Sequence, residues 1–152
     1  MGLDVAAFTH MHKRQSYETY EDGEDFLSKG WYWVHQGDSS HELFEGLVPG
    51  WHAPSEDHVR ELDTFSFKAG SYTTYANWHT LLGRQSWVAD FRLLATHDGC
   101  DGCIGPFACR QLAAAFDKHA EKAAAVGTLF NAIYRDFQRA FHIGAEGFVC
   151  FR

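Results

Sequence analysis

No run in the sequence approaches 18 consecutive apolar residues, so the sequence predicts no membrane-spanning helix and no membrane partner. The opening stretch, MGLDVAAFTHMHK, has no basic segment followed by a long apolar one, which is the pattern of a secretory signal. Four cysteines in a chain without such a signal are typical of reduced thiols. We therefore expect a cytoplasmic protein.

An excess of basic residues is also lacking. The chain has 13 Lys and Arg against 20 Asp and Glu, which gives a formal charge of −7. Proteins that bind nucleic acid without sequence preference need a basic face that displaces counterions from the phosphates. We therefore expect no direct nucleic-acid partner. Acidic residues gather in YETYEDGEDF (17–26), which lacks EF-hand spacing and is typical of a solvated loop.

The familiar catalytic signatures GxSxG, HExxH, GxGxxG and the P-loop are absent from the sequence. This absence favours a protein that is not an enzyme. The composition is that of a folded chain, with 45% hydrophobic and 16% aromatic residues. A length of 152 residues suits a single domain, 1–152, within which 35–65 reads as a long irregular region.

Hydrophobic periodicity predicts the elements. Leu3, Val5 and Ala7 alternate as on a strand, whereas Cys109, Leu112 and Phe116 recur as on one face of a helix. Ser71 is expected to cap a helix, and Pro106 suits a first turn. We expect strands at 3–11, 31–34, 65–70, 88–97 and 148–151, and helices at 71–83, 106–125 and 128–143.

This order of elements predicts an α+β fold in two layers. The sheet is expected to be small and mixed or antiparallel. An antiparallel pair of C-terminal helices would pack on it, together with a shorter central helix.

The segment HDGCDGCIGPFAC (97–109) allows three interpretations. His97, Cys100, Cys103 and Cys109 are residue types that zinc prefers, so the segment could hold a structural zinc ion. The CxxC pair could instead be a redox site. The favoured interpretation is a tight turn over 98–105, in which the glycines adopt positive φ and the acids bind backbone amides.

The segment FKAGSYTTYANWH (67–79) gathers aromatic side chains at the start of a helix. Its periodicity favours an ordinary core-facing stripe. The alternative is a ligand pocket that holds a nucleotide, with the rings stacking on the base and the turn amides binding phosphate. The residues proposed for this ligand site are Asp4, Ser71, Tyr72, Tyr75, Trp78 and Asp101.

Five segments resemble those of a group of small, uncharacterised bacteriophage and prophage proteins. The matching segments are MGLD (1–4), EGLVPGW (45–51), FKAGSYTTYANW (67–78), CDGCIG (100–105) and AFHIGAEGFVCF (140–151). The resemblance spans nearly the whole chain. It implies an accessory protein in the cytoplasm of a bacterial host that binds and inhibits a host protein, for example a CRISPR-type defence effector.

The same resemblance bears on the cysteines. Cys100 and Gly102 have counterparts in the similar sequences, whereas His97, Cys103 and Cys109 generally do not. A zinc site would therefore be peculiar to this chain. Three hypotheses remain: a non-enzymatic inhibitor of a host factor, a small-ligand sponge or enzyme, and a structural zinc protein.

Overall fold

The computed structural model describes residues 2–9, 12–13, 41–44, 51–52, 64–97 and 102–151. The predicted strand at 31–34 and most of the 35–65 region lie outside these residues. No helix within the described residues is long and apolar enough to span a bilayer.

The main sheet has four strands in the order β4-β1-β6-β5. These strands are β4 (Thr64–Ser71), β1 (Gly2–Phe8), β6 (Phe148–Phe151) and β5 (Gly102–Ile104), and every neighbouring pair is antiparallel. A separate two-stranded pairing joins β2 (His12–Lys13) to β3 (Trp51–His52). The α+β fold class is therefore confirmed, with an antiparallel sheet.

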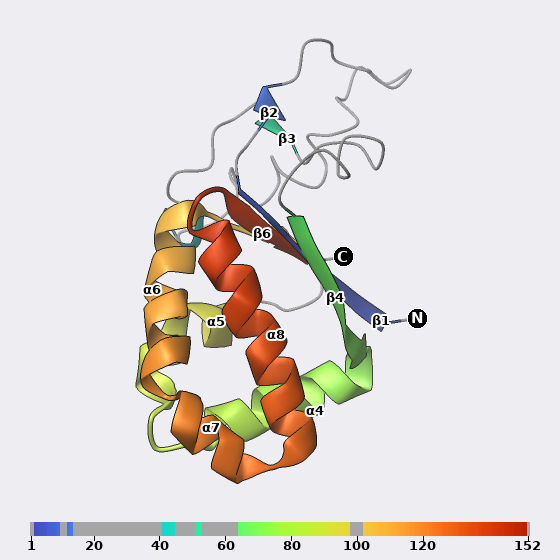
Figure 1. The fold of residues 1–152 in the computed structure, drawn as a ribbon, viewed down its shortest axis with the longest axis vertical. Helices are drawn as coiled ribbons and strands as arrows, with labels where there is room; N and C mark the ends of the chain where they lie inside the picture. Colours follow the sequence, from blue (N-terminus) through green and yellow to red (C-terminus); the bar gives the residue numbers. More distant parts are fainter. Residues whose placement is uncertain are drawn as a thin grey trace.

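One face of the sheet packs against helices (Figure 1). The helix α8 (Thr128–Gly144) contacts β1, β4 and β6, and α6 (Pro106–Lys118) lies beside it. Cys109, early in α6, lies against Gly144 at the end of α8, whereas Phe116, late in α6, bonds to Tyr134 in the middle of α8. The two helices therefore run in opposite directions, connected by α7 (Ala120–Val126).

The core forms where the apolar faces of these helices meet the sheet. The ring of Phe137 contacts Phe67 on β4, Phe151 on β6 and Trp78 on α4 (Tyr72–Gly83). Phe137 is fully buried. Because Phe137 on α8 contacts rings from both the sheet and α4, these elements share a single core.

The prediction of a strand at 88–97 is wrong. Residues Val88–Phe91 form a 3-10 helix, η1, and Arg92–Thr96 form a short helix, α5. Phe91 and Leu94 are both fully buried, and their spacing of three residues places them on one face of a helix. Ala89, Leu93 and Ala95 add helix-forming propensity, so both composition and spacing favour helix here.

The turn predicted at 98–105 is also corrected in part. Residues Gly102–Ile104 form the edge strand β5, which pairs with β6. Gly105 has a φ of −75°, so its backbone does not use the positive φ that was expected there. The N–H of Gly105 donates to the carbonyl of Leu43, in α2 (His41–Phe44), at 2.7 Å. Residues 98–101 lie outside the described residues.

Candidate functional site

Gly70 and Ser71 of the AGSY segment form the turn from β4 into α4. Gly70 has a φ of +94°, and a Cβ there would lie 2.7 Å from the side chain of Thr74. The Ser71 Oγ accepts a hydrogen bond from the Thr74 amide at 3.1 Å, as predicted for a helix cap. The sharp turn from β4 into α4 therefore accounts for both residues.

Two of the aromatic residues proposed to bind a ligand are core residues. Tyr75 and Trp78 are 4% and 3% exposed, and the Trp78 Nε1–H donates to the carbonyl of Phe130 at 3.1 Å. The Trp78 ring also stacks on Phe130 and Phe137. Neither ring is placed to stack on a base, which agrees with the favoured interpretation of a core-facing stripe.

Three of the other proposed ligand residues lie at one end of the β1–β4 ribbon. Tyr72 is 40% exposed, and Ser71 and Asp4 are exposed as well. In the β1–β4 register, Gly2 is opposite Ser71 and Asp4 is opposite Lys68, so Asp4 and Ser71 lie close along the ribbon. Asp101 lies outside the described residues. A ligand role for these exposed residues stays a prediction.

The proposed zinc ligands are only partly described. Cys109 is fully buried, its Sγ donates to the carbonyl of Ile104 at 3.5 Å, and burial raises the pKa of its thiol. A metal-binding thiolate is disfavoured there. His97 is buried with its ring against Phe151. Within the described residues, no group of three or more His, Cys, Asp or Glu side chains is placed to hold a metal ion.

The prediction that all four cysteines are reduced is wrong. Cys150, on β6, is disulfide-bonded, whereas Cys109 carries a free thiol. β6 pairs with β5 (Gly102–Ile104), which contains Cys103, the second cysteine of the CxxC pair. In that pairing the backbone of Cys103 lies directly opposite that of Cys150.

A polar cluster that the sequence analysis missed lies where α6 ends. The Nε2 of His119 donates to the Asp90 carboxylate at 2.7 Å, and Lys118 Nζ donates to the same oxygen at 3.0 Å. These hydrogen bonds, from His119 first, lower the pKa of Asp90. His119 is 4% exposed and its ring stacks on Trp87, while its Nδ1 has no hydrogen-bond partner within the described residues.

Next to this cluster lies a cavity of about 430 Å³ between η1–α5 and α6. Its apolar lining consists of small and aliphatic side chains, whereas Asp90, Arg92, Gln111 and Lys118 supply the polar part. Arg92 donates to Glu42 on α2 at 2.6 Å. The cavity could therefore hold a small polar ligand only if that ligand competes with these ion pairs.

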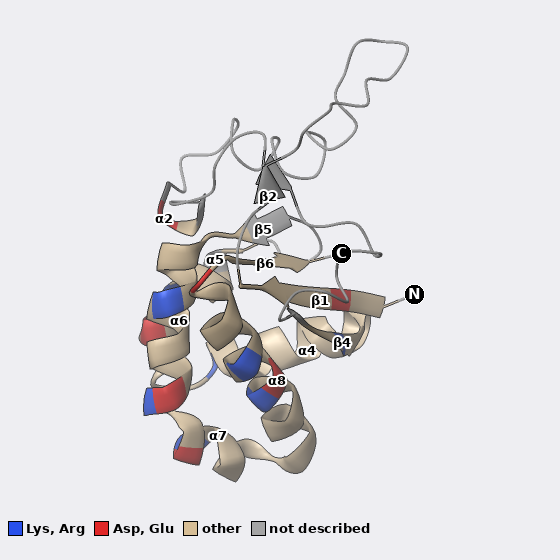
Figure 2. Ribbon diagram, turned by 45° about the horizontal axis from the view of Figure 1, so that its top comes forward, with Lys and Arg blue, Asp and Glu red and all other residues tan. Residues whose placement is uncertain are grey.

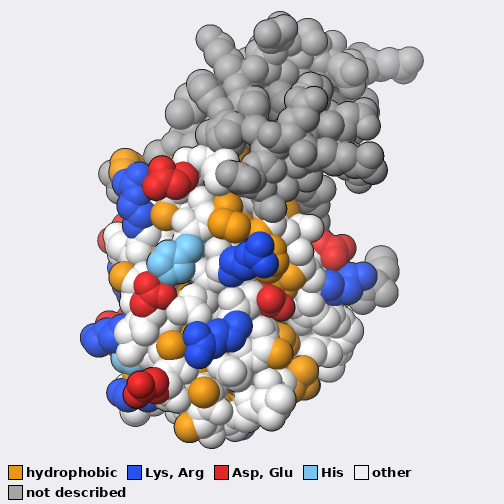
Figure 3. All heavy atoms as spheres, viewed as in Figure 1, with side chains coloured by type: hydrophobic (Ala, Val, Ile, Leu, Met, Phe, Trp, Pro, Cys, Tyr) orange, Lys and Arg blue, Asp and Glu red, His pale blue; other side chains and the backbone are white. Residues whose placement is uncertain are grey.

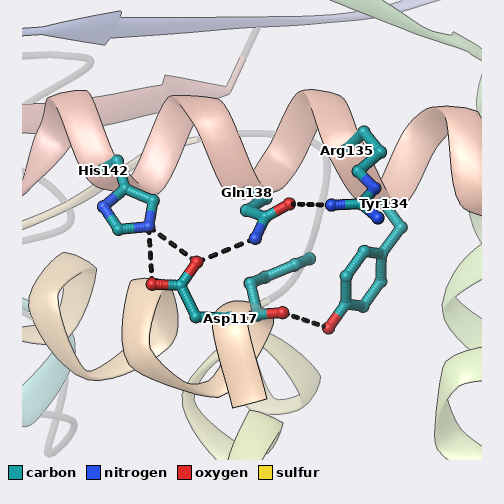
Figure 4. A network of polar contacts seen from close by, with 6 residues as sticks. Asp117, Tyr134, Arg135, Gln138 and His142 are labelled. Atoms are coloured by element: carbon teal, nitrogen blue, oxygen red, sulfur yellow. Dashed lines mark hydrogen bonds and ion pairs between the residues drawn. The ribbon is translucent and has the colours of Figure 1, made fainter. Parts of the chain in front are cut away.

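A second Asp–His contact joins α6 to α8 (Figure 4). The Nε2 of His142 donates to both carboxylate oxygens of Asp117, at 2.8 and 2.9 Å. Gln138 donates to the same carboxylate at 2.8 Å, and Arg135 donates to Gln138 at 3.1 Å. Burial raises the pKa of Asp117, but the hydrogen bonds from His142 and Gln138 outweigh it, so the pKa is lowered.

The two Asp–His contacts differ in burial, and each joins two elements of the fold. His119 is enclosed by aromatic rings, and its carboxylate partner is already bound by Lys118. In the second contact, about half of each side chain is exposed. The His142 Nε2 and both carboxylate oxygens of Asp117 join α8 to α6. We interpret both contacts as structural links between helices.

Charge is distributed unevenly along the chain. Residues 10–63 hold 12 acidic and 4 basic residues, whereas the remainder holds 8 acidic and 9 basic ones. Figure 2 shows that both signs of charge occur on α6, α7 and α8. On the face shown in Figure 3, hydrophobic side chains are interspersed with charged ones. The negative charge of the protein therefore comes from residues 10–63.

Comparison of the chain with protein-family models, with curated proteins and with solved structures found no match. Support for a function therefore comes from the charge and geometry of the chain itself.

Proposed function

We propose that this protein is a phage or prophage accessory protein that binds and inhibits a host factor in the bacterial cytoplasm. The target is a protein whose basic cleft normally holds nucleic acid, such as a CRISPR-type defence effector. The observation that carries this proposal is the concentration of acidic residues in 10–63. The resemblance to phage and prophage proteins supports the same context.

The electrostatic argument starts from the target. A cleft that binds nucleic acid is lined with Lys and Arg, which attract an acidic partner from a distance and favour one orientation of approach. Residues 10–63 have an excess of eight acidic over basic residues, 12 against 4. The rest of the chain, with 8 acidic and 9 basic residues, contributes no comparable attraction. The acidic segment therefore determines which partners the protein attracts.

The described helices and the main sheet form the folded body to which residues 10–63 are attached. The Asp–His contacts join the end of α6 to η1 and α6 to α8, and the shared core packs these helices on the sheet. Phe8, the last residue of β1, lies opposite Thr64, the first residue of β4, so residues 10–63 join the body at two neighbouring strands. Within 10–63, α2 also contacts the body, because Leu43 is buried in the core and accepts a hydrogen bond from Gly105.

A plaque assay tests the proposal. Bacteria carrying a CRISPR-type defence are made to express the protein and are challenged with a targeted phage. We expect the wild-type protein to restore plaque formation. The variant Glu21→Gln/Asp22→Asn/Glu24→Gln should restore it less, because three charges are lost from the acidic segment.

The matched control removes three charges elsewhere, as Asp4→Asn/Glu121→Gln/Glu146→Gln, all at exposed positions. It should restore plaque formation as well as the wild type does. If the wild-type protein relieves no defence system and recovers no stoichiometric partner from host lysate, the proposal is wrong.

A second candidate function is the binding of a small ligand such as a nucleotide. The observation that favours it is the cavity beside Asp90, which Arg92 and Lys118 line. A phosphate would bind there by taking the place of Glu42 at Arg92 and of Asp90 at Lys118. Exposed Tyr72 and Ser71 offer a separate position for the same class of ligand. A thermal-shift screen against linear and cyclic nucleotides tests this candidate, because a ligand that binds only the folded state raises Tm.

In that screen, Arg92→Gln should abolish a Tm shift caused by nucleotide bound in the cavity. Tyr72→Ala should abolish a Tm shift caused by nucleotide bound at the start of α4. The absence of any shift at millimolar nucleotide would exclude both positions. The zinc hypothesis has a separate test in metal analysis of the purified protein. Less than about half an ion per chain would end it.

A further inference from the structure

The disulfide of Cys150 needs a partner among the remaining cysteines. The chain has four cysteines, and Cys109 carries a free thiol that is fully buried against the end of α8. Burial raises the pKa of the Cys109 thiol, which keeps it protonated and poorly reactive. Two candidates are left, Cys100 and Cys103, the two members of the CxxC pair.

The strand register distinguishes these candidates. In the antiparallel pairing of β5 with β6, Cys103 is directly opposite Cys150, between the pairs Gly102–Phe151 and Ile104–Val149. Opposed residues on antiparallel strands have Cα atoms about 4.5–5.5 Å apart. That spacing falls within the range of about 4.4–6.8 Å over which a disulfide can form. We propose that Cys103 and Cys150 are a redox-active pair that fastens the edge strand β5 to β6.

The chemistry of this site is a two-electron thiol–disulfide exchange. In the reduced protein, Cys103 and Cys150 are thiols. Oxidised glutathione, or another small disulfide, accepts two electrons from them, and the two protons pass to the two thiols that it releases. A dithiol reductant reverses the reaction, since it forms its own disulfide and returns two protons and two electrons to the cysteines.

The location of the bond gives it a structural effect. β5 is a three-residue edge strand, so few backbone hydrogen bonds hold it to β6. The loop that the bond closes contains α6, α7 and α8. All four residues of β6 are buried. Reduction is therefore expected to weaken the β5 pairing and to leave an edge of β6 open to solvent.

Disulfide mapping of the wild-type protein tests the assignment directly. After incubation with oxidised glutathione and alkylation of free thiols, cleavage at aspartate and arginine gives peptides 98–100, 101–110 and 140–152. These separate Cys100 from Cys103 and Cys150. We expect 101–110 linked to 140–152, with fragmentation placing the bond on Cys103 and the alkyl group on Cys109. A link between 98–100 and 140–152, or no link to 140–152, would overturn the proposal.

Hydrogen exchange tests the effect on the sheet. Amides of β6 should exchange faster in the protein treated with dithiothreitol than in the oxidised protein. The variant Cys103→Ser should show fast exchange under both conditions, whereas the matched control Cys100→Ser should respond to dithiothreitol as the wild type does. Equal exchange in the oxidised and reduced wild-type protein would contradict the structural role, and a redox response that is lost in Cys100→Ser but kept in Cys103→Ser would contradict the pairing.

Discussion

The body of the protein, residues 2–9, 64–97 and 102–151, differs from residues 10–63 in what each contributes. The body contains most of the buried core, and the acidic and basic residues outside 10–63 nearly balance, at 8 and 9. Residues 10–63 contain 12 of the 20 acidic residues. Packing and charge are therefore carried by different parts of the chain. Substitutions should be able to change the stability of the body and the affinity for a basic partner separately.

The most damaging substitution in the body should be Phe137→Ala. The Phe137 ring is fully buried and contacts aromatic rings from β4, α4, α6 and β6. Its removal leaves a cavity at the centre of the core, and we expect a loss of about 3–5 kcal/mol in the free energy of unfolding. Urea unfolding followed by tryptophan fluorescence measures this loss.

The control for this experiment is Leu129→Ala, because Leu129 is 69% exposed. Its effect should stay within about 0.5 kcal/mol. Where the Phe137→Ala protein is still folded, it should bind its partner normally. A loss of affinity in that folded protein would show that the body contributes to binding. It would contradict the claim that residues 10–63 alone determine affinity.

The two Asp–His contacts offer a sharper comparison within the body. His119 is buried, stacks on Trp87 and bonds to Asp90, so His119→Ala should lower the free energy of unfolding by about 2–3 kcal/mol. His142 is about half exposed, so His142→Ala should cost at most about 0.5 kcal/mol. Thermal and urea unfolding of the two variants check this order. Equal losses would contradict the difference in burial.

Close packing between α6, α8 and β6 predicts an effect at Gly144. A Cβ at this position would lie 2.6 Å from Val149 Cγ2 and 2.9 Å from Cys109 Sγ. Gly144→Ala should therefore destabilise the protein by about 1–2 kcal/mol. Gly83 also ends a helix, and no atom lies within 4 Å of a Cβ built there, so Gly83→Ala should change stability by less than about 0.5 kcal/mol. Similar effects at the two glycines would contradict the packing at Gly144.

The smallest expected effect is a pH dependence that differs between two carboxylates of the body. The pKa of Asp117 is lowered in the folded state, so its contribution to stability is present above its ordinary pKa of 3.8 and is lost as the pH falls below it. Burial raises the pKa of Asp136, so its charged form costs stability at neutral pH and that cost disappears in acid.

Urea midpoints between pH 7 and pH 3 measure both effects. Asp117→Asn should lower the midpoint at pH 7 and make its fall toward pH 3 shallower. Asp136→Asn should raise the midpoint at pH 7 and make that fall steeper. Changes of the same sign in the two variants would show that the environments of Asp117 and Asp136 do not differ in this way.

The sequence predicted those parts of the fold that depend on local patterns. The Ser71 cap, the start of a helix at residue 128 and the final strand Phe148–Phe151 were all predicted, and all are confirmed. Each depends on residues a few positions apart, such as a hydroxyl before a helix or a glycine between two apolar stripes. The strand predicted at 88–97 is wrong for a local reason, because Phe91 and Leu94 have the spacing of one helix face.

Contacts between distant residues could not be predicted in this way. Asp90 and His119 are 29 residues apart, and no sequence motif contains both of them. The same holds for Cys150, which is disulfide-bonded although no motif in the sequence pairs it with another cysteine. The burial of Tyr75 and Trp78 was favoured by their periodicity, whereas their partner Phe137 comes from a helix formed far later in the chain. These contacts depend on tertiary packing, which periodicity does not encode.

The most direct test of the central claim is a competition measurement with a purified CRISPR-type effector and its labelled nucleic acid. We expect the wild-type protein to displace the nucleic acid, and we expect this displacement to weaken as the salt concentration is raised. Glu21→Gln/Asp22→Asn/Glu24→Gln should displace it less well, while Asp4→Asn/Glu121→Gln/Glu146→Gln should match the wild type. No displacement at low salt, or equal displacement by the two variants, would contradict the claim that residues 10–63 carry the binding function.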